Sequence, residues 1–293
     1  MPRFLLTRVT HCLLALLMLA CGLPAQAGTS IWEVSKGGQR LLLGGTIHVL
    51  RDQDYPLPEA YQRAFDQAEL VIFETDLRDT QGPQFQQTLL STVRYPADES
   101  LADYLTPEAM EALTSHCAER GIPVSVLLPF KPAWTMLTLL GLELQRLGIT
   151  STGVDHFYTE RALRENKAIA GLESAQQQLE FITSLGIGNE SELVLHTLQE
   201  LRQTETLLAQ MVQMWREGDL EAMNRVFVEP MASDYPEIYQ TVLAERNTAW
   251  LPQLERHLQG EKTALALVGV AHLVGEDGLL KQLRQRGYRV KRY

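Results

Sequence analysis

The chain has 293 residues, of which 45% are hydrophobic and 21% charged, and its 26 Lys and Arg against 36 Asp and Glu give a formal net charge of −10 at pH 7. A chain of this length and composition can bury a sizeable core. The acidic balance argues against nucleic acid or an anionic membrane surface as a partner, because both require a basic face.

The first 27 residues have the features of a secretory signal peptide. A basic start with two arginines precedes an apolar core over 12–22 and an A-x-A cleavage site over 25–27. We expect Sec export with cleavage before Gly28, which gives a periplasmic or secreted protein with a net charge of −12. Cys21 leaves lipidation as a less favoured alternative, because the residues before it fit the lipoprotein pattern poorly.

The mature chain offers no further membrane segment and no disulfide. No later stretch approaches the roughly 18 uninterrupted apolar residues that a membrane span needs. Cys117 is the one cysteine left after cleavage, and a lone cysteine cannot form an intrachain disulfide. We interpret Cys117 as a small apolar residue on a helix.

Strands alternate with helices at both ends of the mature chain, and the middle is helical. The expected elements are a hairpin over 31–45, a helix from 58, a strand over 70–73, helices over 107–121, 132–147 and 153–167, a strand over 168–172, long helices over 190–216, 220–227 and 235–258, a strand over 263–270, a helix over 276–287 and a strand over 288–293. This order predicts one α/β domain over 28–293, with a central mixed sheet flanked by helices and a helical insertion at about 189–258.

The same glycine–histidine turn occurs twice, near each end of the mature chain. "LLLGGTIHVL" places His48 three residues after Gly45, and "TALALVGVAHLVG" places His272 three residues after Gly269. Glycines after a strand indicate a tight turn or a close approach of the backbone. The recurrence is the main indication of a functional site.

Four strand-like segments end in a side chain able to do chemistry: His48, Glu74, Glu173 and His272. Ligands of open α/β sheets bind beyond the carboxyl ends of the strands, so these side chains are expected to converge. Imidazole and carboxylate suit Zn, Mn, Co or Fe, and three protein ligands would leave a position for an activated water. The remaining carboxylate could act as general base or orient a histidine.

Other roles remain open for each of these residues. A histidine after a glycine turn is often bonded to the backbone of its loop. A glutamate that closes a strand can satisfy the amides of the next helix, and Ser174 after Glu173 is a natural N-cap.

Several polar residues of helices are weaker candidates. Asp155, beside His156 at a helix start, is either a cap or a substrate-binding pocket residue. Arg246 and Asn247 are either solvated or positioned to bind substrate, where a guanidinium could clamp a carboxylate or an oxyanion. The chain has no G-x-x-x-x-G-K loop, G-x-S-x-G elbow or H-E-x-x-H pair. Three further histidines are expected in surface or packing roles: His116, His196 and His257.

Four motifs in this order resemble the TraB/GumN family, to which the Tiki proteins are related: "GGTIH", "VIFET", "AERN..W" and "VGVAHLVG". The resemblance spans nearly the whole mature chain. It implies an α/β fold shared with haem-binding ChaN and erythromycin-esterase-like proteins, and, for the Tiki branch, a metal-dependent peptidase that favours Mn or Co over Zn.

Transferred residue by residue, the family's two histidines are His48 and His272, its glutamate is Glu74 and its arginine is Arg246, with Glu173 a further acidic position. The resulting hypothesis is an exported metallohydrolase acting on a peptide or protein, in which His48, His272 and Glu74 hold the metal and Arg246 stabilises the oxyanion. The alternative is a non-catalytic periplasmic binder of a peptide or a haem-like ligand.

Overall fold

The computed structural model describes residues 29–149 and 152–293. The expected signal peptide, residues 1–27, and its cleavage site before Gly28 lie outside these ranges. None of the described helices is both long enough and apolar enough to cross a membrane.

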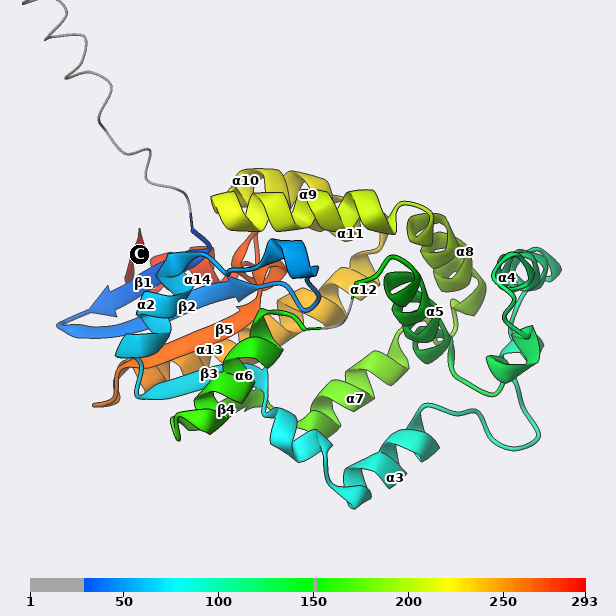
Figure 1. The fold of residues 1–293 in the computed structure, drawn as a ribbon, viewed down its shortest axis with the longest axis horizontal. Helices are drawn as coiled ribbons and strands as arrows, with labels where there is room; N and C mark the ends of the chain where they lie inside the picture. Colours follow the sequence, from blue (N-terminus) through cyan, green and yellow to red (C-terminus); the bar gives the residue numbers. More distant parts are fainter. Residues whose placement is uncertain (1–28, 150–151) are drawn as a thin grey trace, which may run out of the picture.

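A six-stranded mixed sheet forms the centre of the fold, as the sequence predicted (Figure 1). Its strand order is β4-β3-β5-β2-β1-β6. β2 pairs in parallel with β5, β5 with β3, and β3 with β4, whereas β1 is antiparallel to both β2 and β6. The strands are β1 (Ile31–Lys36), β2 (Gln39–Thr46), β3 (Leu70–Thr75), β4 (Ala168–Glu173), β5 (Ala264–Gly269) and β6 (Arg289–Arg292).

The register brings the carboxyl ends of the four parallel strands to one edge of the sheet. Thr46 at the end of β2 pairs with Gly269 at the end of β5, and Thr75 at the end of β3 pairs with Glu173 at the end of β4. Side chains that follow or end these strands therefore lie at the same level, although they are far apart in the sequence.

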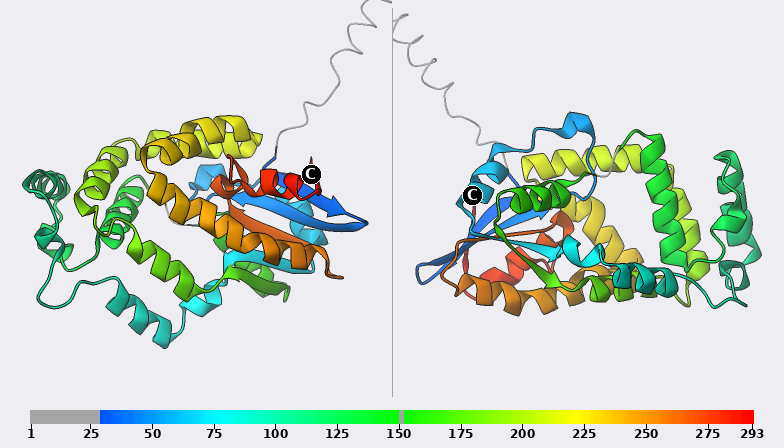
Figure 2. Two further views of the ribbon diagram at one scale, coloured as in Figure 1. Left: turned by 180° about the vertical axis from the view of Figure 1, so that it is seen from behind. Right: turned by 60° about the horizontal axis from the view of Figure 1, so that its bottom comes forward.

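Helices cover both faces of the sheet. Figures 1 and 2 show α13 (Glu245–Leu258) and α14 (Leu279–Gln285) on one face and α2 (Glu59–Gln67) and α6 (Val154–Arg164) on the other. All six residues of β5 are buried, as expected for a central strand with both faces covered.

A second group of helices lies beyond the carboxyl ends of the parallel strands (Figure 1). It has a separate apolar core to which α4, α5 and α8 contribute, and Cys117 is buried in that core as a free thiol, as expected. The remaining helices are α3 (Pro83–Thr92), α4 (Pro107–Glu119), α5 (Pro132–Arg146), α7 (Ala175–Ser184), α8 (Glu190–Leu201), α9 (Thr204–Glu217), α10 (Leu220–Met223), α11 (Glu229–Asp234) and α12 (Pro236–Tyr239).

The predicted long helices are interrupted in the structure. The prediction of one helix over 190–216 was wrong. The helix is interrupted between Leu201, the end of α8, and Thr204, the start of α9, and the Thr204 hydroxyl donates to the Leu201 carbonyl at 3.0 Å. The helices expected over 220–227 and 235–258 each overlap a five-residue π-helical segment, at Asn224–Val228 and Gln240–Ala244. A further helix, α3, was not predicted, although its Pro83 occupies the first helical position.

The glycines expected to form a turn, Gly44 and Gly45, lie inside β2, and buried hydrogen bonds hold the carbonyl of Gly45. The Gly45 carbonyl accepts from the Trp215 indole at 2.7 Å and from the Tyr61 hydroxyl, and the indole also contacts that hydroxyl at 2.7 Å. A Cβ at Gly45 would lie 2.9 Å from the Val270 side chain, which explains the glycine by close approach rather than by an unusual φ. Packing therefore fixes the end of β2, which His48 follows.

We expect Trp215→Phe to lower the free energy of unfolding by about 1–3 kcal/mol, because it removes a buried donor while keeping an aromatic ring. Urea denaturation followed by far-UV circular dichroism measures the loss. Trp134→Phe is the control, since Trp134 is half-buried and its indole has no hydrogen bond among the described residues. Equal losses in the two variants would show that indole volume, not hydrogen bonding, stabilises the end of β2.

Candidate functional site

The structure brings the four predicted residues together at the carboxyl edge of the sheet. Glu74 lies in β3 and Glu173 ends β4, while His48 and His272 follow β2 and β5. The Glu74 Oε1 atom is 4.0 Å from Nε2 of His48 and 3.8 Å from Nε2 of His272. The imidazoles supplied by the two ends of the chain therefore face the same carboxylate oxygen.

Glu74 is buried, and both of its oxygens have donors. Oε1 accepts from the Gly269 amide at 2.7 Å, and Oε2 accepts from the Arg246 guanidinium at 2.6 Å. Burial opposes the charge of Glu74, but the neighbouring His272 and His48 rings and Arg246 outweigh it and lower its pKa to about 2. Glu74 is therefore a carboxylate at neutral pH.

Arg246 joins Glu74 to Glu173. Its Nε and Nη2 atoms donate to Glu173 at 3.1 and 2.7 Å, and Nη2 also donates to Glu74. Nη1 donates to the Val242 carbonyl and to Nε2 of His272, both at 3.2 Å. All five N–H groups of the guanidinium are thus engaged, and it offers no free donor in this arrangement.

Aromatic rings hold the guanidinium from both sides. The guanidinium carbon of Arg246 lies 4.5 Å from the Phe181 ring centre and 4.6 Å from that of Trp250. The Trp250 indole also donates to Glu173 at 3.2 Å. The π-helical segment Gln240–Ala244 directly precedes α13, and such segments often occur at functional sites.

Asn247 fixes the ring of His272. Nδ1 of His272 donates to Oδ1 of Asn247 at 2.8 Å, and the Asn247 amide nitrogen donates to the carbonyls of His272 and Asp277. This network assigns the proton to Nδ1, so the lone pair of Nε2 accepts from Arg246, and Nε2 lies 3.8 Å from Oε1 of Glu74. Burial lowers the pKa of His272 to about 3, so the ring is neutral. Asn247, proposed from the sequence as a substrate contact, is 1% exposed and orients a histidine here.

Asp155 performs the equivalent role for His48. Its Oδ2 atom lies 2.8 Å from Nδ1 of His48, and its Oδ1 atom accepts from the Thr46 hydroxyl at 2.8 Å. The charge of Asp155 raises the pKa of His48 to about 9. The His48 side chain is 63% exposed, so solvent and salt screen part of this attraction. His156, the neighbour of Asp155, lies instead beside Glu160.

The donor atoms fit a divalent cation in type and charge, although they do not form a closed metal site. Among residues 29–149 and 152–293, no group of three His, Cys, Asp or Glu side chains is close enough to hold a metal as it stands. Two ligand atoms that are each about 2.1 Å from one ion lie at most about 4.2 Å apart. The two distances from Glu74 Oε1, 3.8 and 4.0 Å, fall within that limit.

The net charge of the site and the space between its donor atoms also fit a divalent cation. With both imidazoles neutral, the three carboxylates and one guanidinium of the site carry two net negative charges, which one divalent cation balances. Space remains between the donors because residue 269 is glycine. A Cβ there would lie 3.2 Å from Oε1 of Glu74 and 3.3 Å from Nε2 of His48.

An open hollow of about 610 Å³ adjoins the site on the side of Glu173. Arg246, Trp250, Phe181 and Thr241 contribute to its walls. Neither motif histidine lines this hollow. His272 is buried, and His48 is exposed to solvent outside the hollow. We call this hollow the cleft.

Sequence reasoning missed four contributors to the site: Thr46, the Gly269 amide, Trp250 and Phe181. Thr46 and Trp250 lie inside the quoted motifs, so their positions carried some indication, whereas no pattern marked Phe181. The other histidines lie outside the site. His116 is buried on α4, His257 is at the end of α13, and His196 bonds Tyr235 at 2.8 Å.

Comparison with known proteins confirms the family resemblance. The model of the TraB/PrgY/gumN family matches residues 30–292. Uncharacterized protein YbaP of Escherichia coli (strain K12) is 25% identical over 250 residues, which cover 85% of this chain and 89% of YbaP. No solved structure matches the chain.

Two metalloproteases are also similar. Metalloprotease TIKI1 of Homo sapiens is 24% identical over 91% of this chain, and Metalloprotease TIKI2 of Danio rerio is 26% identical over 85% of it. The matches cover 62% and 57% of these relatives, so the chain spans less than two thirds of their length. This similarity is distant.

We expect Asp155→Asn to lower the pKa of His48 from about 9 towards the ordinary value of 6.5. Because the folded-state pKa is raised, the stabilisation from protonated His48 is complete below about pH 6.5 and is lost as the pH rises through about 9. Titration of the imidazole nitrogens by NMR in the presence of EDTA measures this value. Glu160→Gln, an exposed change on the same helix, should leave it unchanged. A wild-type pKa near 6.5 would contradict the assignment.

Proposed function

We propose that this chain, which belongs to the TraB/PrgY/gumN family, is a metal-dependent hydrolase that cleaves peptide bonds. One observation carries the proposal. A single buried carboxylate oxygen of Glu74 faces Nε2 of two histidines, and each histidine is oriented through its other nitrogen by an acceptor. Paired orientation of this kind is typical of histidines that bind metals. The distant similarity to the two metalloproteases supports the choice of reaction.

His48, His272 and Glu74 would hold the cation. A divalent metal bound there supplies a Lewis acid and an activated water near neutral pH. Asp155 and Asn247 fix which nitrogen of each ring is free. Without a metal, the negative charge of Asp155 favours protonated His48. A bound cation would supply that positive charge instead, and His48 would bind it as a neutral ring.

Arg246 is the candidate for stabilising an oxyanion. In the structure, its Nη1 donates to Nε2 of His272, so the group has no free hydrogen. If His272 held a metal through that nitrogen, the Nη1 hydrogen would be free to donate to a developing negative charge on the substrate carbonyl. Glu173 and the rings of Phe181 and Trp250 keep the guanidinium in place, so we assign Glu173 a positioning role.

The cellular setting belongs to the same proposal. The basic start, apolar core and A-x-A site of residues 1–27 support export to the periplasm or the medium. The net charge of −12 expected after cleavage suits neutral or basic peptide substrates better than acidic ones.

The direct test is metal content together with peptidase activity. His48→Ala and His272→Ala should each lose bound Mn²⁺, measured by isothermal titration calorimetry, and hydrolysis of a quenched fluorescent peptide library. Far-UV circular dichroism should remain unchanged. His156→Ala is the control, because His156 is exposed and outside the site. Metal binding at the wild-type level in either His48→Ala or His272→Ala would contradict the proposal. Binding of metal and peptide by the wild type without hydrolysis would favour the non-catalytic binder.

A second variant tests the cation site without removing any of its side chains. Gly269→Ala should weaken Mn²⁺ binding by about tenfold or more, because the new methyl group would lie 3.2 Å from Oε1 of Glu74 and 3.3 Å from Nε2 of His48. Gly141→Ala is its matched control, since a Cβ at that helical glycine meets nothing within 4 Å. Unchanged affinity in Gly269→Ala would show that the cation does not bind between these donors.

A further inference from the structure

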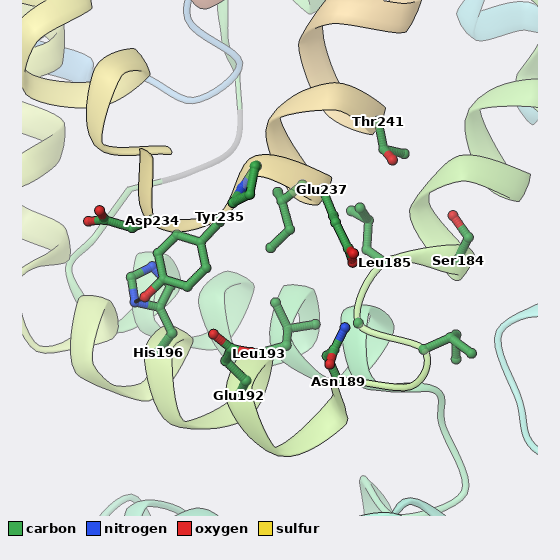
Figure 3. Close-up of a pocket in the computed structure, with 14 residues that line it drawn as sticks. Ser184, Leu185, Asn189, Glu192, Leu193, His196, Asp234, Tyr235, Glu237 and Thr241 are labelled. Carbon is green, nitrogen blue, oxygen red and sulfur yellow. Dashed lines mark hydrogen bonds between the residues drawn. The ribbon is translucent and has the colours of Figure 1, made fainter. Parts of the chain in front are cut away.

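A second pocket, of about 340 Å³, lies between α8, the end of α7 and the start of α12 (Figure 3). Figure 3 shows Leu193 and Asn189 reaching into it from one side and Tyr235 and Glu237 facing them from the other. We call it the acidic pocket.

The walls of the acidic pocket combine apolar groups with one sign of charge. Leu185, Leu193 and Ile238 supply apolar surface, and the carboxylates are those of Glu192, Asp234 and Glu237. No lysine or arginine lines the pocket, and none of the three carboxylates forms an ion pair within the described part of the chain.

Two further residues shape the pocket. Ile187, which lines it, is 49% exposed and adds apolar surface at its rim. The ring of Tyr235 lies 4.1 Å from that of His196, centre to centre, and the two side chains are hydrogen-bonded. This pair gives the pocket a fixed aromatic wall.

The acidic pocket shares walls with the cleft beside Arg246. Thr241 lines both hollows. Phe181 of the cleft and Ser184 of the pocket are three residues apart on α7 and thus share one face of that helix. Thr241 and helix α7 therefore form walls of both hollows, and an extended ligand could occupy the two hollows at once.

We propose that the acidic pocket is a specificity subsite that receives a lysine or arginine side chain of the peptide substrate. This inference rests on the proposed function. The aliphatic stem of such a side chain would pack against Leu185, Leu193 and Ile238, while its cationic end reaches Glu192 and Glu237. A bare cation would leave the apolar walls exposed, and a wholly apolar side chain would desolvate the carboxylates without pairing them.

The position of the pocket predicts where the basic residue lies in the substrate. Glu237 is nine residues before Arg246, which corresponds to about 13 Å along a helix. An extended peptide advances about 3.3 Å per residue. The basic residue is therefore expected about four residues from the hydrolysed bond.

The test measures peptide binding without hydrolysis. Fluorescent peptides that differ only in one residue, lysine or norleucine, are titrated by anisotropy against the purified protein in EDTA, with the variable residue placed at each position in turn. The wild type should bind the best lysine peptide about tenfold more tightly than its norleucine partner, and salt should reduce the difference. The double variant Glu192→Gln, Glu237→Gln should lose this preference.

Glu111→Gln is the matched control, because Glu111 is exposed on α4 and does not line the pocket. Equal binding of both peptides to the wild type, absence of binding, or a lysine preference that survives in the double variant would each overturn the subsite. Cleavage with Mn²⁺ separates the two proposals. Lysine-dependent binding without cleavage contradicts the hydrolase alone, and cleavage without lysine preference contradicts the subsite alone.

Discussion

The site depends on one buried carboxylate, that of Glu74, which three distant parts of the chain approach. The Gly269 amide and the Arg246 guanidinium hold its two oxygens, and the rings of His48 and His272 face one of them. A buried carboxylate is stable only if it is paired and hydrogen-bonded. Parallel pairing of β3 with β5, and of β5 with β2, is the constraint that brings these groups together.

Charge balance links the parts of this site. The Arg246 guanidinium pairs with two carboxylates, Glu74 and Glu173, and Asp155 pairs with His48. Without a metal, the proton on His48 offsets part of the negative charge of these three carboxylates. The guanidinium also donates to Nε2 of His272. A cation bound to that nitrogen would therefore replace this hydrogen bond and free one hydrogen of Arg246. Arg246 also lines the cleft.

Much of this arrangement could be predicted from the sequence, because strand ends and glycine turns are local features. The mixed sheet and the convergence of His48, Glu74, Glu173 and His272 followed from them. Tertiary contacts decided the rest. The break between α8 and α9 and the π-helical segment before Arg246 have no glycine or proline to mark them. The acidic pocket joins residues from three separate helical regions, and no sequence pattern indicates that they meet.

The most direct test of the central claim is a crystal structure of the protein soaked in Mn²⁺, with anomalous diffraction at the manganese edge. The account predicts one strong peak within about 2.2 Å of Nε2 of His48, Nε2 of His272 and a Glu74 oxygen, with Arg246 displaced from His272. A peak elsewhere, or full occupancy of manganese with the Arg246–His272 contact intact, would contradict it.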